Sequence, residues 1–525
     1  MKILRHIIIA ASFIAACSTQ AETPKRPALV IGITIEGLSS DYITLLEDLM
    51  TDEGFKRLKN QGLWFEQIDY GPGLDATAAT AVLYTGASPA VNGIGGEKIY
   101  SKTHKAAFHV FNDPDQVGNF TSETYSPKAL LVSNLTDELR IDSRGYGIAE
   151  TVAPSAAEAI AMGGHAGNGT FWISDASGLW ATSTWYPDMP NAVSQRNYRT
   201  PLSQRIDSMK WTPLFSPLLP GVSDQKRFST FEHRFAKGDP DRYVMFKASA
   251  LGNREITDMA IELINAQGLG RHSGMDMLNV GYTLAPYSYG KSADATIETL
   301  DAYLRLDRDI ARLLKAAEAK AGRGEVAVFL GGTPAEANDK RDASEWRIPY
   351  GQFSGKKAES LLNMYLMALH GNGQWIHGYH GGHFYLNTDL IKERQLDLGA
   401  IRAESAEFLT RMAGVAEAWT IDDVIAMRIG EGEAAAIKRN TPVKSSGDII
   451  IRTAPGWEVV DDGSQRAPVV NRLSRKAIPA AIMAPGVNAR IVSERTDARV
   501  IAPTVARALW VRCPNGASLA PVSLR

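Results

Sequence analysis

The chain has 525 residues, of which 44% are hydrophobic, and its formal net charge is -2. This length allows a large buried core, and the absence of any basic run excludes a nucleic-acid-binding surface. The only cysteines are Cys17 and Cys513, so we expect Cys513 to be an unpaired, buried thiol.

The first residues are typical of an export signal. Met1 to His6 is basic, and Ile7 to Ala16 is apolar but too short to span a bilayer. The small residues before Cys17 resemble a bacterial lipobox, in which Cys17 is lipidated; the alternative is ordinary cleavage near Ala21. We therefore expect an export signal over residues 1–21. The protein is expected in the bacterial periplasm or at the outer membrane, with this lipid anchor as its only membrane contact.

The remainder, residues 27–525, alternates buried strands with long helices. Ala28 to Ile35 is a continuous apolar run, as in a strand covered on both faces of a parallel sheet. The alternation predicts an α/β domain with helices on both faces of a mostly parallel sheet, and ligands beyond the carboxyl ends of its strands. The further strands are expected at Met277 to Leu284, Glu325 to Leu330 and Ala477 to Met483, and the helices at Ala293 to Ala321, Lys356 to His370 and Arg402 to Met412.

The stretch from about residue 108 to 238 differs in composition. It is rich in Asn, Ser, Pro and Trp, which indicates a cap inserted over the edge of the sheet. Its clustered aromatic residues either form the core of the cap or stack on a sugar, base or peptide: Trp172, Trp180, Trp185 and Tyr186.

Several motifs together resemble the alkaline phosphatase superfamily, specifically its monomeric periplasmic phosphatases close to the type I phosphodiesterase and nucleotide pyrophosphatase group. The resemblance runs from about Ala28 to Ser518 and implies an alkaline-phosphatase-like fold. The motifs are Tyr84-Thr85-Gly86, Asn92-Gly93-Ile94, Gly164-His165, Tyr303-Leu304-Arg305-Leu306-Asp307, Phe329-Leu330, Tyr385-Leu386-Asn387 and Ile501-Ala502-Pro503-Thr504.

The resemblance implies two zinc ions that clamp a phosphoryl group, and a Thr or Ser nucleophile. The residues that carry this chemistry are missing at the corresponding positions. The six metal-ligand positions hold Glu36, Pro286, Gly290, Thr333, Pro334 and Ala477. The three phosphate-binding positions hold Glu97, Ser155 and Ala157.

The nucleophile position, counted from Tyr84, holds Ala76, which has no oxygen with which to attack. If the count is shifted by one residue, the nucleophile position holds Thr77. Asp75 is the neighbour on the other side of Ala76. The alternative for Thr77 is a structural role in the first turn of the following helix.

A cluster of histidines, His377, His380 and His383, is the other candidate metal site. Its spacing and glycine content favour a solvated loop that leads into the next strand.

The coordinated loss of ligands and nucleophile predicts a non-catalytic binding or assembly component of the cell envelope, without a cofactor. Its partner is expected to be an envelope protein or a phosphorylated or glycan ligand. The alternative is a phosphate or sulfate ester hydrolase that uses Glu36 with Thr77 or Asp75 and a displaced zinc.

Overall fold

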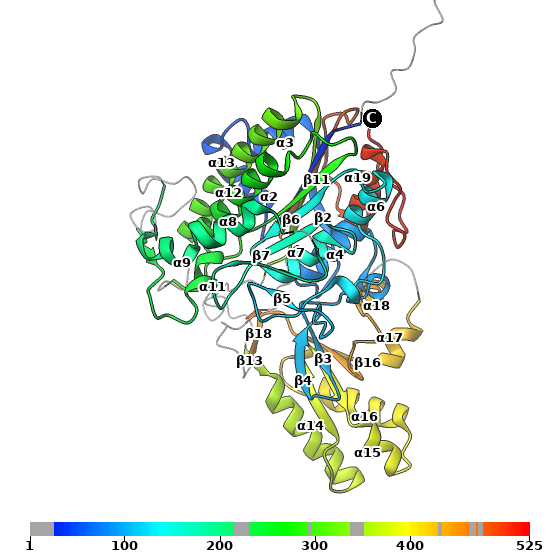
Figure 1. Cartoon of the computed structure of the whole chain (residues 1–525). Helices are drawn as coiled ribbons and strands as arrows, with labels where there is room; N and C mark the ends of the chain where they lie inside the picture. Colours follow the sequence, from blue (N-terminus) through cyan, green and yellow to red (C-terminus); the bar gives the residue numbers. More distant parts are fainter. Residues whose placement is uncertain are drawn as a thin grey trace, which may run out of the picture.

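The computed structural model describes residues 26–187, 189–214, 230–290, 296–335, 351–428, 433–460, 469–470 and 476–525. Its centre is an eleven-stranded mixed sheet with the order β21-β2-β20-β12-β1-β11-β6-β7-β8-β5, in which β22 also pairs with β2 (Figure 1). The strands of this sheet are β1 (Leu29–Glu36), β2 (Leu63–Asp69), β5 (Gly118–Asn119), β6 (Ala149–Ala153), β7 (Gly169–Ile173), β8 (Trp180–Ser183), β11 (Asp276–Thr283), β12 (Val326–Thr333), β20 (Ile478–Met483), β21 (Arg490–Val492) and β22 (Thr496–Asp497).

The middle of the sheet is parallel, as predicted. β1 pairs in parallel with β11 on one side and β12 on the other, so that Leu29 lies opposite Asp276 and Val326. Every residue of β1 except Glu36 is buried, because helices cover both of its faces. β20 is antiparallel to its neighbours β12 and β2, which makes the sheet mostly rather than wholly parallel.

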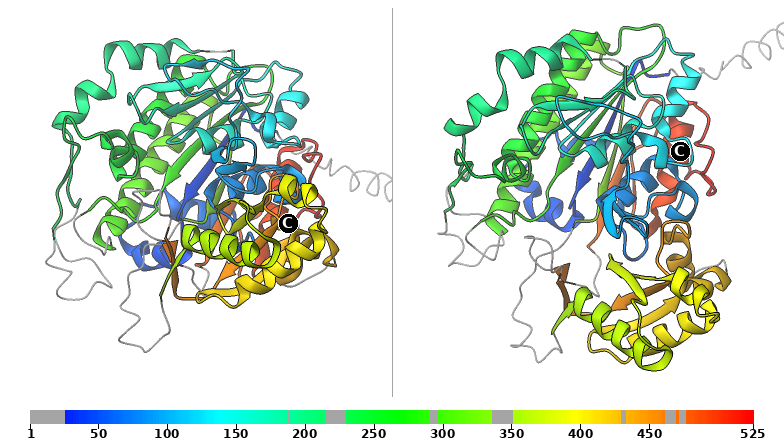
Figure 2. Two further views of the ribbon diagram at one scale, coloured as in Figure 1. Left: turned by 90° about the horizontal axis from the view of Figure 1, so that it is seen from below. Right: turned by 60° about the horizontal axis from the view of Figure 1, so that its bottom comes forward.

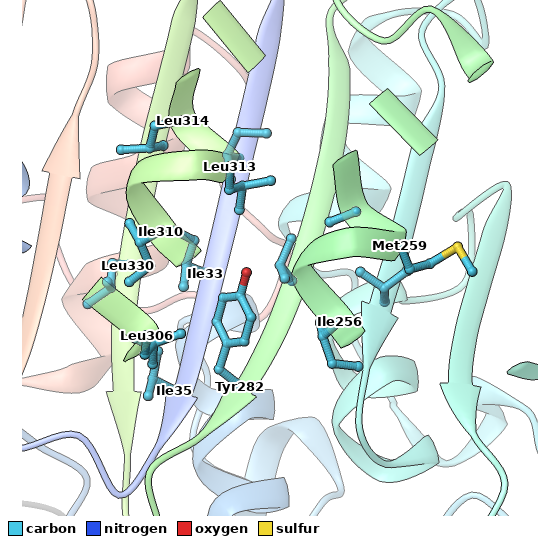
Figure 3. Packing of buried hydrophobic residues seen from close by; sticks show 14 of the residues in the cluster. Ile33, Ile35, Ile256, Met259, Tyr282, Leu306, Ile310, Leu313, Leu314 and Leu330 are labelled. Carbon is cyan, nitrogen blue, oxygen red and sulfur yellow. The ribbon is translucent and has the colours of Figure 1, made fainter. Parts of the chain in front are cut away.

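One face of the sheet carries the long helices α12 and α13. Figure 3 shows side chains of β1, β11 and β12 packed against these two helices, with Ile33, Tyr282 and Ile310 fully buried. Burial of each such side chain contributes about 1.5–3 kcal/mol. The helices on this side are α2 (Ser40–Leu46), η1 (Glu47–Leu49), α3 (Phe55–Gln61), α8 (Asn191–Arg199), α9 (Leu202–Arg205), η3 (Ile206–Ser208), α11 (Arg242–Lys247), α12 (Ala250–Gln267) and α13 (Thr296–Ala321).

The opposite face is covered by shorter helices. Asp75 caps the first turn of α4, and Gly86 ends this helix in the left-handed region at φ 64°, which a residue without Cβ adopts freely. The elements on this side are α4 (Ala76–Thr85), α5 (Pro89–Asn92), η2 (Pro127–Ala129), α6 (Leu135–Asp142), α7 (Ala156–Gly163), η4 (Ala498–Val500) and α19 (Ile501–Leu509).

A second lobe, over residues 351–460, lies at the end of the molecule where the parallel strands finish (Figure 2). It has its own four-stranded sheet, β14-β15-β17-β16, and its own hydrophobic core. The lobe and the short strands beside it comprise β13 (Gly351–Ser354), α14 (Gly355–His370), β14 (Ile376–His380), β15 (His383–Leu386), α15 (Thr388–Glu393), α16 (Leu398–Thr410), β16 (Val415–Thr420), α17 (Ile421–Ala426), α18 (Glu433–Asn440), β17 (Ile449–Thr453), β18 (Trp457–Val460) and β19 (Val469–Val470).

A hairpin of β3 (Lys98–Ser101) and β4 (Ala106–His109) joins this lobe to the main body. The ring of Tyr100 stacks on that of Tyr385 at 4.4 Å. Lys102 pairs with the buried Asp448 of the lobe at 2.8 Å between Nζ and Oδ2. These contacts hold the lobe beside the carboxyl edge of the central sheet.

The stretch 108–238, expected as a cap, contributes β5, β6, β7 and β8 to the central sheet itself, together with the small hairpin of β9 (Lys210–Trp211) and β10 (His233–Arg234). Trp172, Trp180 and Tyr186 are each at most 2% exposed, because they pack between the sheet and its helices. These three side chains therefore belong to the hydrophobic core, and in this conformation they cannot stack on a ligand.

The expected export signal and Cys17 lie outside the described residues. Among the helices that the structure describes, none is both long enough and apolar enough to cross a membrane. The prediction of a buried Cys513 is wrong: this thiol is exposed, because it follows α19 in a surface loop.

Candidate functional site

Three polar residues meet where the central parallel strands end. Glu36 is the last residue of β1, and in the register of the sheet it lies between Thr283 of β11 and Thr333 of β12. Thr283 donates a hydrogen bond from Oγ1 to Glu36 Oε2 at 3.1 Å. The buried Thr333 Oγ1 has no hydrogen-bond partner among the described residues. Glu36 is therefore a half-buried carboxylate flanked by two hydroxyl groups.

A second carboxyl group, Glu158 of α7, covers this edge. Its side chain is 8% exposed, and a Cβ at Gly281 would lie 2.8 Å from its Oε1, so the glycine makes room for it. Burial, and the negative charge of Glu36, raise the pKa of Glu158 well above its usual value. Glu158 Oε1 has no hydrogen-bond partner in the described part of the chain. A buried carboxyl group whose ionisation is disfavoured thus lies near the carboxylate of Glu36.

The nucleophile region lies at the first turn of α4. Asp75 Oδ1 accepts a hydrogen bond from Ala78 N at 2.9 Å, and Oδ2 accepts one from Glu97 N at 2.7 Å. Ala76 is the first helical residue, and Thr77 is 6% exposed within the same turn. Asp75 has a structural role here, and the first turn offers no exposed hydroxyl group for attack.

The three phosphate-binding positions carry no positive charge. Ser155 caps α7 by accepting a hydrogen bond from Glu158 N at 3.3 Å, and Ala157 is buried. Glu97 is half-buried and lies near His109. Burial lowers the pKa of His109 to about 4, so this ring is neutral near pH 7. The site is therefore acidic where the resemblance implies cations.

The remaining zinc positions do not fit zinc. Pro286, Gly290, Pro334 and Ala477 offer no side-chain donor, and the backbone oxygen of Ala477 accepts a hydrogen bond from Ser40 N at 2.8 Å. Nowhere in the described ranges do three His, Cys, Asp or Glu side chains converge in a way that could hold a metal ion. We therefore derive no step through a zinc pair.

The histidine cluster forms a hairpin instead of the expected loop. His377 and His380 lie on β14, and His380 is paired with His383 of β15. His383 Nδ1 accepts a hydrogen bond from Gly447 N at 3.3 Å, and burial lowers its pKa to about 4. These histidines are among the residues that form no metal-binding group.

Sequence reasoning missed one acid–base pair close to this edge. His233 Nε2 and Glu298 Oε1 are 3.0 Å apart, and a Cβ at Gly290 would lie 3.3 Å from His233 Cε1. The two residues come from β10 and α13, 65 positions apart in the chain. No spacing rule connects them, so only the tertiary structure reveals the pair.

Two residues of the family motif on α13, Tyr303 and Asp307, have structural roles. Ser39 N donates a hydrogen bond to Tyr303 Oη at 2.8 Å. Asp307 accepts hydrogen bonds from the backbone amides of Thr51 and Phe55, at 2.7 and 2.9 Å. They anchor α13 to the loops around α2 and α3.

A mostly parallel central sheet with helix layers on both faces is the fold of the alkaline phosphatase superfamily. Residues 30–472 match the type I phosphodiesterase / nucleotide pyrophosphatase family, and the chain belongs to that family.

Relatives of the chain match it nearly end to end. An alkaline phosphatase, PhoV of Synechococcus elongatus, is 28% identical over 94% of this chain and 92% of its own. The alkaline phosphatase PafA of Elizabethkingia meningoseptica is 24% identical over 99% and 98%. A protein of Myroides odoratus named calcium-transporting ATPase is 27% identical over 96% and 95%.

A crystal structure of wild-type PafA superposes with a TM-score of 0.82 at 23% identity, covering 95% of this chain and 98% of that one, which confirms the fold.

These relatives correct the functional prediction. A non-catalytic binding or assembly component is contradicted by full-length similarity to two alkaline phosphatases, which favours hydrolysis of phosphoric esters.

Proposed function

We propose that the protein is a phosphoric ester hydrolase and that Glu36 is the general base of its reaction. The supporting observation is the position of Glu36: a half-buried carboxylate at the carboxyl end of the central strand, hydrogen-bonded by Thr283. Ligands of parallel α/β sheets bind at this edge.

Glu36 would act on a water molecule. Its carboxylate accepts a proton while the water oxygen forms a bond to phosphorus, and the bond from phosphorus to the ester oxygen breaks. The leaving oxygen keeps the electron pair of that bond. Glu36 then returns its proton to the leaving group or to solvent. Burial raises the pKa of Glu158, which disfavours a second negative charge beside the base.

The charge of the site favours a particular substrate class. Ser155 and Ala157 supply no cation, and Glu97 adds a carboxyl group. A phosphate monoester carries close to two negative charges at neutral pH, whereas a phosphodiester or a sulfate ester carries one. We therefore propose monoanionic esters, phosphodiesters first, as the preferred substrates.

The test is hydrolysis of an aryl phosphodiester, an aryl phosphate and an aryl sulfate by the purified protein. We expect the diester to be hydrolysed fastest, and Glu36→Gln to lower kcat/KM by about 10²–10⁴-fold, because the amide cannot accept the proton. The matched control is Glu53→Gln, which alters an exposed carboxylate on the loop before α3 that pairs with Arg57. His233→Gln tests the neighbouring acid–base pair.

Three results would contradict the proposal. One is no turnover of any of the three esters. Another is full activity in Glu36→Gln with loss in His233→Gln, which would move the base to His233. The third is activity abolished by a chelator and restored by zinc, which would show that a metal ion takes part.

A further inference from the structure

The chain enters the fold at the edge of the sheet opposite the candidate site. Arg26 lies three residues before β1 begins, and Tyr146 lies three residues before the parallel strand β6 begins. Both therefore mark the amino edge of the sheet. A strand of eight residues, such as β1, spans about 26 Å, so this edge and Glu36 are well separated.

Arg26 is fixed to two neighbouring elements at this edge. Its guanidinium pairs with Asp142 at the end of α6 and donates a hydrogen bond to the backbone oxygen of Trp510, just after α19, at 3.3 Å. Arg512 pairs with Glu138 of α6 at 2.7 Å between Nε and Oε2. Figure 1 shows α6 and α19 side by side, away from the second lobe. The point where the chain enters thus lies within the surface that these two helices form.

That surface exposes large apolar side chains. Ile141 is 55% exposed, Tyr146 is 68% exposed and Trp510 is 59% exposed. We call these three residues the amino-edge patch. Trp and Tyr are the residues enriched where proteins meet the headgroup region of a bilayer, because their rings are apolar and carry a polar atom.

Arginines surround the patch. Arg144 and Arg507 are exposed, and neither has an acidic partner within the ranges that the structure describes. Arg26 and Arg512 are paired with Asp142 and Glu138. Cations close to an anionic bilayer are attracted by its negative surface potential, and this attraction extends over about 8–10 Å at physiological salt.

The length of chain before the fold supplies the remaining argument. Nine residue steps separate the predicted lipidation site, Cys17, from Arg26. They span at most about 30 Å even when fully extended. A lipid on Cys17 would hold the patch near the bilayer at an effective concentration of about millimolar, so that weak contacts suffice for docking.

We propose that the amino-edge patch docks on an anionic lipid bilayer when Cys17 is lipidated, which turns the strand-end site away from the membrane. The proposal rests on lipidation of Cys17 and is independent of the proposed hydrolase activity. The ligand is the bilayer surface itself, recognised by Tyr146 and Trp510 and by the surrounding arginines.

Cys513 provides a direct probe. It is exposed three residues after Trp510, and a lipid on Cys17 leaves it as the only free thiol in the chain. Full-length lipidated protein is reconstituted in vesicles of phosphatidylethanolamine and phosphatidylglycerol, and a spin label on Cys513 is tested for accessibility to a water-soluble paramagnetic reagent. The matched control combines Cys513→Ser with Ser360→Cys, which places the label on exposed α14 of the second lobe.

We expect the Cys513 label to lose most of its accessibility on reconstitution and the Ser360 position to keep it. Tyr146→Ser with Trp510→Asn should restore accessibility at Cys513; Asn suits position 510 because the backbone there is left-handed, at φ 59°.

Equal accessibility at both positions would overturn the proposal. So would a mass for the mature protein that begins after Cys17, because the tether would then be absent. A Cys513 label that stays protected in the double variant would also contradict it, since the patch would not be the contact.

Discussion

Two buried carboxyl groups at opposite edges of the central sheet, Asp276 and Glu158, differ in their hydrogen bonds. At the amino edge, Asp276 is fully buried and accepts hydrogen bonds from Ile148 N at 2.7 Å and Gly270 N at 2.6 Å, and His272 Nδ1 lies 2.8 Å from its Oδ2. At the carboxyl edge, Glu158 is almost as buried, yet its Oε1 lacks a partner among the described residues. One group stabilises the fold; the other costs stability where chemistry is proposed.

The difference has a physical reason. A buried polar atom without a hydrogen-bond partner costs about 1–3 kcal/mol of stability. A fold tolerates such an atom only where other contacts hold the surrounding structure in place. Active sites accept this cost because a ligand can satisfy groups that the protein leaves open. Among the described residues, Glu158 Oε1 and Thr333 Oγ1 both lack a hydrogen-bond partner near the edge where Glu36 ends β1.

The largest effect is expected at the amino edge. Asp276→Ala should lower the free energy of unfolding by about 3 kcal/mol or more, because it leaves two backbone amides and His272 without their acceptor. Urea unfolding measures this loss. Asp276→Asn, which keeps one oxygen, should lose less. A change within experimental error would mean that the amino edge does not depend on this carboxylate.

At the carboxyl edge, replacing the buried carboxyl group of Glu158 should raise the free energy of unfolding instead of lowering it. The folded-state pKa of Glu158 is raised, so its contribution to stability is fully present below the ordinary glutamate pKa of 4.5 and is lost as pH rises through the folded-state value. Glu158→Gln cannot ionise. We expect it to be more stable than the wild type once the pH exceeds the ordinary glutamate pKa, because the variant has no charge to bury.

The measurement for Glu158→Gln is thermal unfolding across the acid-to-alkaline range. The difference between variant and wild type should grow with pH and vanish below about pH 4.5. A difference that is constant with pH would show that Glu158 does not titrate in this way.

The smallest effect concerns substrate charge. Glu97→Lys replaces a carboxylate at a phosphate-binding position with a cation, and its backbone amide still bonds Asp75. We expect kcat/KM for an aryl monoester to rise about five- to tenfold relative to the diester, as a nearby charge change of two units in a solvated site predicts. An unchanged ratio of the two rates would mean that Glu97 lies too far from the ester to select it.

Much of the fold was predictable because its signals are local. The apolar run at residues 28–35 became β1, and the expected helix ending at Ala321 became α13 with the same last residue. The second lobe was not recognised, because its strands are short and two of them, β15 and β17, pair although about 65 residues, including four helices and β16, separate them in the chain. Such pairing leaves no periodic trace in the chain.

The sequence by itself determined the family and the buried parallel strands, since each depends on residue identity or apolar pattern at a known spacing. The tertiary structure alone decided that residues 118–183 join the central sheet and that Glu158 lies over Gly281 near Glu36. It also decided that His233 meets Glu298 beside Gly290. These contacts depend on how strands and helices pack from distant parts of the chain, and the burial that sets the pKa of Glu158 exists only once they have packed.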